Sequence, residues 1–137
     1  MIIITAIDDR GGMMFNHRRQ SQDRILREKI LALTVDKRLW MNRYSEKQFK
    51  DCHSSHINVD DNFLTEAAPG EFCFVEDQAV APHEKWIEQI ILFKWNRKYP
   101  GDLFFDIDLQ RGGWVLERTE EFEGSSHEKI TMEVYGR

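Results

Sequence analysis

The sequence predicts an α/β protein with a central, mostly parallel β-sheet, flanking helices and a C-terminal antiparallel hairpin. Continuous apolar runs such as residues 2–7 and 89–95 are typical of strands that are buried on both faces of a parallel sheet. A helical pattern follows the first run, and strands that alternate with helices favour a parallel sheet. Residues 113–122 and 128–136 alternate apolar and polar side chains, which indicates an antiparallel pair at the sheet edge.

A helix at residues 21–34 is the first one expected. Its N-terminal signal is Ser21, a favourable N-cap, with Asp23 in the first turn. The stretch 8–20 before it lacks a clear hydrophobic period and is predicted to be a loop. The apolar residues that recur at helical spacing are Leu26, Ile30 and Leu33.

The other expected elements are short. Ser45 is the expected cap of the second helix. Strands are predicted at 38–42, 56–60, 71–76 and 89–95, with a strand-like piece at 103–109; helices are predicted at 45–52 and 61–67, and a helical turn at 83–88.

The composition predicts one globular domain spanning 1–137. The chain is 41% hydrophobic and 12% aromatic, and it contains no apolar run of the ~18 residues that a membrane helix needs. The N-terminus lacks the basic start of a signal peptide, so we expect a cytoplasmic protein. Cys52 and Cys73 do not form a disulfide framework, and Cys73 lies in an apolar strand.

Charge is distributed unevenly along the chain. The net charge is −5, yet residues 1–50 hold eleven Lys/Arg against six Asp/Glu. This basic first third could face an anionic ligand, although a helix such as 21–34 normally has a solvated charged face. Nucleic-acid binding is the weakest option because the chain is acidic overall and has no aromatic-interleaved basic stripe.

Few motifs point to chemistry. Cys52, His53 and His56 form one loose cluster, which is weak support for zinc, so no metal site is predicted. Ser125 and Ser126 stand beside His127, but sequence neighbours rarely form a triad, and a tight connection between strands explains them more simply. No phosphate-binding glycine motif is present.

One carboxylate remains a candidate. Asp23 leans toward the apolar side of the predicted helix, where a carboxylate at a pocket rim could have a raised pKa and protonate a ligand. The alternative is that Asp23 only stabilises the helix N-terminus.

The order of elements resembles the dihydrofolate reductase family, whose fold has three layers, over nearly the whole chain. "IITAIDDRGGM" is similar to the first strand and active-site loop of the family, with Gly12 near the usual loop glycine. "SQDRILREKIL" resembles the helix that carries the catalytic acid, which falls on Asp23. "LWMNRYSEKQF" resembles the M-G-R-[KH]-T segment. Three later segments resemble the closing strands and final hairpin of the family: "EQIILFKWN", "DLFFDID" and "GWVLERTEEFEGSSHEKITMEVY".

The largest departure is "GEFCFVED", which resembles the strand before the Gly-Gly of the family. Glu76-Asp77 stand where that glycine pair approaches the phosphates of the cofactor. Unit charges ~4 Å apart at an effective dielectric of ~20 repel by about 4 kcal/mol, roughly a thousandfold in affinity. We therefore expect no cofactor.

Other positions depart as well. Asn42 replaces the motif glycine, Arg27 stands where an aromatic usually packs on the pterin, and Phe93 takes the place of a strand threonine. The Trp after the loop is lacking, and the chain is shortened between Cys52 and Ile57.

Three hypotheses follow. The leading one is a dihydrofolate-reductase-like protein that does not reduce folate and binds another small anionic ligand between the first strand and helix 21–34. The positive field of that site would come from five arginines: Arg18, Arg19, Arg24, Arg27 and Arg43. The second is an NAD(P)H-dependent reductase with an altered substrate and NADPH as its cofactor. The third is a non-catalytic interaction module, in which an exposed cluster around Trp86 and Trp95 would form a homodimer or partner surface. The resemblance gives Asp23 as the catalytic candidate and Ala6, Met13, Arg24, Arg27, Arg43 and Ser45 as ligand-binding candidates.

Overall fold

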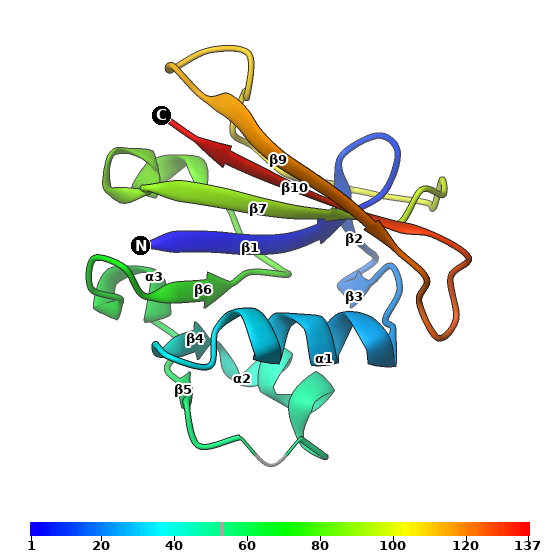
Figure 1. The fold of residues 1–137 in the computed structure, drawn as a ribbon, viewed down its shortest axis with the longest axis horizontal. Helices are drawn as coiled ribbons and strands as arrows, with labels where there is room; N and C mark the ends of the chain where they lie inside the picture. Colours follow the sequence, from blue (N-terminus) through cyan, green and yellow to red (C-terminus); the bar gives the residue numbers. More distant parts are fainter. Residues whose placement is uncertain (53) are drawn as a thin grey trace.

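A seven-stranded β-sheet forms the centre of the molecule (Figure 1). The computed structural model describes residues 1–52 and 54–137. The sheet has the strand order β5-β4-β6-β1-β7-β10-β9. Its middle strand β1 (Ile2–Ile7) pairs in parallel with β6 (Phe72–Phe74) on one side and with β7 (Gln89–Lys94) on the other.

The two ends of the sheet differ in strand direction. On one side β6 continues in parallel to β4 (Leu39–Met41) and β5 (Ile57–Val59). On the other side β10 (Ile130–Gly136) runs antiparallel to both β7 and the edge strand β9 (Val115–Phe122). The predicted mixed sheet with a C-terminal antiparallel hairpin is confirmed.

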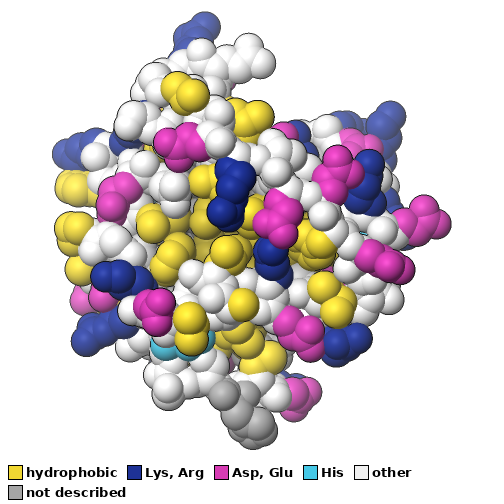
Figure 2. Space-filling model, viewed as in Figure 1, with side chains coloured by type: hydrophobic (Ala, Val, Ile, Leu, Met, Phe, Trp, Pro, Cys, Tyr) yellow, Lys and Arg dark blue, Asp and Glu magenta, His cyan; other side chains and the backbone are white. Residues whose placement is uncertain are grey.

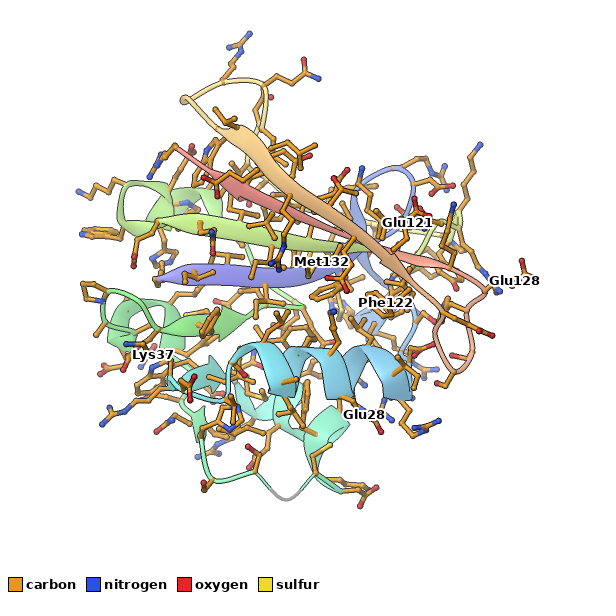
Figure 3. The ribbon with its side chains drawn as sticks, in the orientation of Figure 1. Glu28, Lys37, Glu121, Phe122, Glu128 and Met132 are labelled. Carbon is orange, nitrogen blue, oxygen red and sulfur yellow. The ribbon has the colours of Figure 1, made fainter. Side chains whose placement is uncertain are left out.

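Strand β1 separates two hydrophobic cores because successive side chains point to opposite faces. Ile4 faces a core that also contains Leu26 and Ile30 of helix α1 (Arg24–Leu33). Phe122 and Met132 of the hairpin join this core, and Figure 3 labels them on β9 and β10 beside α1. The helical spacing recognised in the sequence therefore marks the buried stripe of α1.

The opposite face of the sheet is covered by short helices and loops. Ile3 and Ile7 of β1 point into this second core. The covering elements are α3 (Phe63–Glu66), the 3₁₀ helix η2 (Ala81–Trp86) and the connection from β8 (Leu103–Phe104) to β9, which contributes Ile107 and Trp114.

The stretch 8–20 is not a loop, so this prediction is wrong. It contains β2 (Gly12–Phe15) and β3 (Arg18–Arg19), and β2 also pairs with β8 in a small second sheet. A tight turn joins the two strands, since Asn16 and His17 have positive φ angles of 50° and 62°. The strands are too short to show a hydrophobic period.

The predicted helix caps are also wrong. Helix α1 is capped by Asp23 rather than Ser21, because the Asp23 carboxylate accepts hydrogen bonds from the N–H groups of Ile25 and Leu26. Helix α2 (Arg43–Glu46) is capped by Asn42 rather than Ser45, and it ends in the 3₁₀ helix η1 (Lys47–Phe49). Both true caps precede the helix by one residue and point back onto its free N–H groups.

The visible face carries charges of both signs. Figure 2 shows Lys and Arg side chains beside Asp and Glu, with hydrophobic side chains between them. Lys29 of α1 reaches across to Glu120 of β9, with 2.6 Å between Nζ and Oε1. Among the residues that the structure describes, no helix has the length and apolar character needed to cross a membrane.

Candidate functional site

A narrow crevice lies where β1 and β6 end, beside the N-terminal half of α1. Its free volume is only about 10 Å³. Polar side chains from β3, from η1 and from the segment before α1 meet the apolar ends of the central strands there. The lining residues are Ala6, Met13, Arg19, Gln20, Ser21, Leu26, Gln48, Phe74, Glu76 and Trp95. The crevice is therefore filled by the protein's own side chains.

Glu76, which follows β6, makes the principal contacts across the crevice. Its carboxylate accepts hydrogen bonds from Nε and Nη2 of Arg19 at 2.9 and 3.2 Å. Gln48 adds a third, from Nε2 to Oε2 at 3.0 Å. The Glu76 side chain is 8% exposed, so this charge is buried and paired inside the protein.

Arg19 is held from two sides. Its guanidinium lies over the ring of Tyr44, with 4.5 Å from Cζ to the ring centroid, and Nη2 also bonds the Tyr44 carbonyl. Burial alone would lower the pKa of Arg19, but the hydrogen bond to Glu76 outweighs it and raises the pKa. Arg19 therefore stays positively charged, and its charge is balanced by Glu76 in the crevice.

Asp77 points to a different partner. It accepts a hydrogen bond from Nδ2 of Asn42 at 2.9 Å, while Oδ1 of Asn42 accepts the N–H of Ser45 at 3.0 Å. Asn42 therefore caps α2 and fixes the end of β6 with a single side chain.

Replacing Asn42 should test this double role. We expect Asn42→Ala to lower the free energy of unfolding by about 1–2 kcal/mol, because a helix cap and a side-chain bond are lost together. Urea denaturation measures the change. The serine variant Asn42→Ser, which can cap but cannot reach Asp77, should recover part of the loss; an Ala variant as stable as the wild type would contradict the assignment.

Asp23 lies behind the crevice rather than in its lining. Its side chain is fully buried beneath the connection between β9 and β10, which lies over the N-terminal end of α1 (Figure 1). Besides the α1 N–H groups, the carboxylate accepts the N–H groups of Ser125 at 3.0 Å and Ser126 at 2.8 Å. Gly124 permits this approach, since a Cβ there would collide with the carboxylate.

His127 completes the surroundings of Asp23. Its Nδ1 lies 2.9 Å from Oδ2 of Asp23, and its ring stacks on Trp95 with 4.4 Å between centroids. Its Nε2 lies 3.0 Å from Oγ of Ser21 and 3.1 Å from the Tyr99 hydroxyl. Burial alone would raise the pKa of Asp23, but the His127 and backbone hydrogen bonds hold it well below its usual range.

Comparison with solved structures identifies the architecture. The chain superimposes on dihydrofolate reductase from Enterococcus faecalis, complexed with NADP(H) and RAB-propyl, with a TM-score of 0.68 over 99% of this chain and 95% of that one. The chain has the dihydrofolate reductase fold. The sequences are 13% identical, so the likeness shows the fold alone. No protein-family model and no curated protein matches the sequence.

Within this dihydrofolate reductase fold, the predicted ligand residues do not all meet. Ala6 and Met13 line the crevice. Ser45 is buried in α2. The three predicted arginines lie elsewhere, because their side chains extend along the surface: Arg24 pairs with Glu28, Arg27 bonds Gln22 and Arg43 approaches Asp61.

Sequence reasoning missed Gln48 and His127 as parts of the site, and it included Arg19 only as one of five arginines of a positive field. A single glutamine in a short helix and a histidine in a hairpin connection carry no periodic signal. Glu76 was recognised as unusual for its position, but its partner was not.

The structure also places the other features that the sequence singled out. Trp95 is 4% exposed and Trp86 is 59% exposed, so these two residues do not form an exposed cluster. Phe93 is fully buried in the core beside α1. Within residues 1–52 and 54–137, no three His, Cys, Asp or Glu side chains converge as metal ligands, and His53 lies outside the described residues.

Proposed function

We propose that this chain is a small-anion-binding protein built on the dihydrofolate reductase fold, and that it does not reduce folates with a nicotinamide cofactor. The observation that carries the proposal is the buried Glu76 carboxylate, bound by Arg19 and Gln48 across the crevice.

Charge and space both oppose binding of a nicotinamide cofactor. The resemblance puts the cofactor phosphates at residues 76 and 77, where this chain has two carboxylates. A phosphate beside Glu76 would meet a repulsion of about 4 kcal/mol, and Arg19 is already neutralised. A free volume of about 10 Å³ also leaves no room for a nicotinamide beside Trp95.

The Arg19–Glu76 pair itself favours binding of a small anion. Glu76 presents two carboxylate oxygens to the planar edge of Arg19, which is the geometry that an arginine offers to a ligand carboxylate or phosphate. A ligand anion could replace Glu76 if that side chain turned outward. The bound ligand would then keep the bonds from Arg19 and Gln48 and the aromatic support of Tyr44.

The first experiment is a titration with NADPH and NADH followed by tryptophan fluorescence. Trp95 lines the crevice and should report on occupancy. We expect no quenching up to millimolar cofactor. Quenching with micromolar affinity would overturn the proposal in favour of a nicotinamide-dependent reductase.

The second experiment uses inorganic pyrophosphate as the probe and calorimetry as the readout. Glu76→Gln removes the competing charge while keeping the shape of the side chain, so we expect at least tenfold tighter binding than in the wild type. Arg19→Gln should abolish binding. Arg38→Gln, at an exposed arginine paired with Glu71, is the matched control and should leave it unchanged. Equal affinity of Arg19→Gln and wild type would refute the anion site.

A further inference from the structure

We infer that Ser21, His127 and Asp23 form a nucleophilic centre that cleaves carboxylic esters. The inference goes beyond anion binding, because it adds a covalent step at a wall of the crevice. It depends on three side chains from two distant segments, the stretch before α1 and the connection between β9 and β10.

The three side chains follow one another at hydrogen-bond distance. Oγ of Ser21 lies 3.0 Å from Nε2 of His127, and Nδ1 of the same ring lies 2.9 Å from Oδ2 of Asp23. This arrangement activates a serine hydroxyl: the nucleophile is hydrogen-bonded to a base, and a buried carboxylate orients the base. Its members are recognised by geometry and not by their order in the chain.

The Asp23 carboxylate decides which ring nitrogen of His127 carries the proton. The ionised carboxylate only accepts hydrogen bonds, so Nδ1 of His127 donates to it. In the neutral ring Nε2 is then the acceptor and faces the Ser21 hydroxyl. Stacking on Trp95 fixes the plane of the ring.

The solvent exposure of the three side chains suits a serine nucleophile, which must be reachable, and a base and carboxylate, which must be shielded from water. His127 and Asp23 have side chains 2% and 0% exposed, whereas Ser21 is partly exposed and lines the crevice. The nucleophile therefore lies on the crevice wall, where a substrate would enter once the Glu76 side chain turned outward, and the base and its carboxylate lie behind it, away from water. Arg19 lines the same crevice and would favour an ester whose acidic group takes the place of Glu76.

The reaction balances with water as the second substrate. Oγ of Ser21 forms a bond to the ester carbonyl carbon while its proton moves to Nε2 of His127. The carbon–oxygen bond to the alcohol then breaks, and the departing oxygen takes that proton. Water adds to the acyl-serine, again giving its proton to Nε2, and the acid leaves as Ser21 recovers its hydrogen.

Helix capping alone does not account for this arrangement. Asp23 already accepts four backbone N–H groups, from two α1 residues and from Ser125 and Ser126. Nε2 of His127 contributes nothing to that cap, yet two hydroxyl groups lie within hydrogen-bond distance of it. Tyr99 is the second of them, and it competes with Ser21 for the same lone pair.

The test is covalent labelling of the full chain with an alkyl fluorophosphonate, followed by intact mass and peptide mapping. We expect one adduct, on Ser21. Ser21→Ala should lose it, Ser55→Ala at an exposed serine should keep it, and His127→Gln should slow labelling by about a hundredfold or more. Tyr99→Phe should accelerate labelling, because Nε2 is then left to Ser21.

Each labelling result either supports or overturns the nucleophilic centre. Folding of Ser21→Ala is checked by circular dichroism, and its side chain makes one hydrogen bond among the described contacts, so loss of the adduct is informative. No adduct on the wild type, or an adduct on another serine, would overturn the nucleophilic centre. Pyrophosphate binding is measured separately, so failure of labelling does not count against the anion site.

Discussion

Asp23→Ala should lower the free energy of unfolding by about 3–5 kcal/mol, the largest loss expected for a single substitution in this chain. The carboxylate caps α1, ties down the hairpin connection through Ser125 and Ser126, and pairs with the buried ring of His127. Alanine leaves all of these donors without an acceptor in a dry environment, and each unpaired group costs about 1–3 kcal/mol.

Urea denaturation followed by circular dichroism measures the loss. Asp36→Ala is the matched control, since Asp36 is exposed in the turn after α1 and its removal should change stability by no more than about 0.5 kcal/mol. A loss below about 1 kcal/mol for Asp23→Ala would mean that the hairpin connection is held by other contacts.

The pH dependence of stability should identify the same carboxylate. Although burial opposes ionisation, the His127 and backbone hydrogen bonds hold the pKa of Asp23 well below its usual range. A group with a depressed pKa adds stability that is complete above its unfolded pKa, about 3.9, and is lost as pH falls toward the folded pKa. Wild-type stability should therefore fall more steeply below pH about 4 than that of Asp23→Asn.

The regular parts of the fold were predictable from the sequence because they depend on local periodicity. The apolar run of β1, the helical spacing of α1 and the alternation in β10 each report which faces are buried. The β2–β3 hairpin was not predictable in this way. Its strands are short, and its turn depends on Asn16 and His17 adopting positive φ angles, which no pattern of hydrophobicity records.

The candidate site was predictable only in part. Glu76 was recognised as unusual because it breaks an expected glycine pair, and Asp23 because of its place before the α1 stripe. Their partners lie far away in the chain: Arg19 is 57 residues from Glu76, and His127 is 104 residues from Asp23. Such pairings follow from strand order, so they emerge only once the sheet is assembled.

Single substitutions in the Arg19–Glu76 pair should lower the free energy of unfolding strongly, and substitution of both residues should lower it only weakly. We expect Arg19→Met and Glu76→Met each to lower the free energy of unfolding by about 2–3 kcal/mol, slightly below the loss for fully buried pairs because Arg19 is 21% exposed. The double variant should recover most of this loss, since two apolar side chains of similar length can pack on Tyr44 and Phe74 without an unpaired charge.

A double-mutant cycle from urea denaturation measures the coupling, expected at about 3–5 kcal/mol, because the two single losses sum to about 4–6 kcal/mol and the double variant recovers most of them. Recovery in the double variant would mean that stability does not require the two charges. A function that uses Arg19 would then be the better reason for their presence, and the double variant should bind no pyrophosphate. If the losses of the two single variants simply add, the charges are not coupled, and the crevice is closed by packing rather than by an ion pair that a ligand anion can replace.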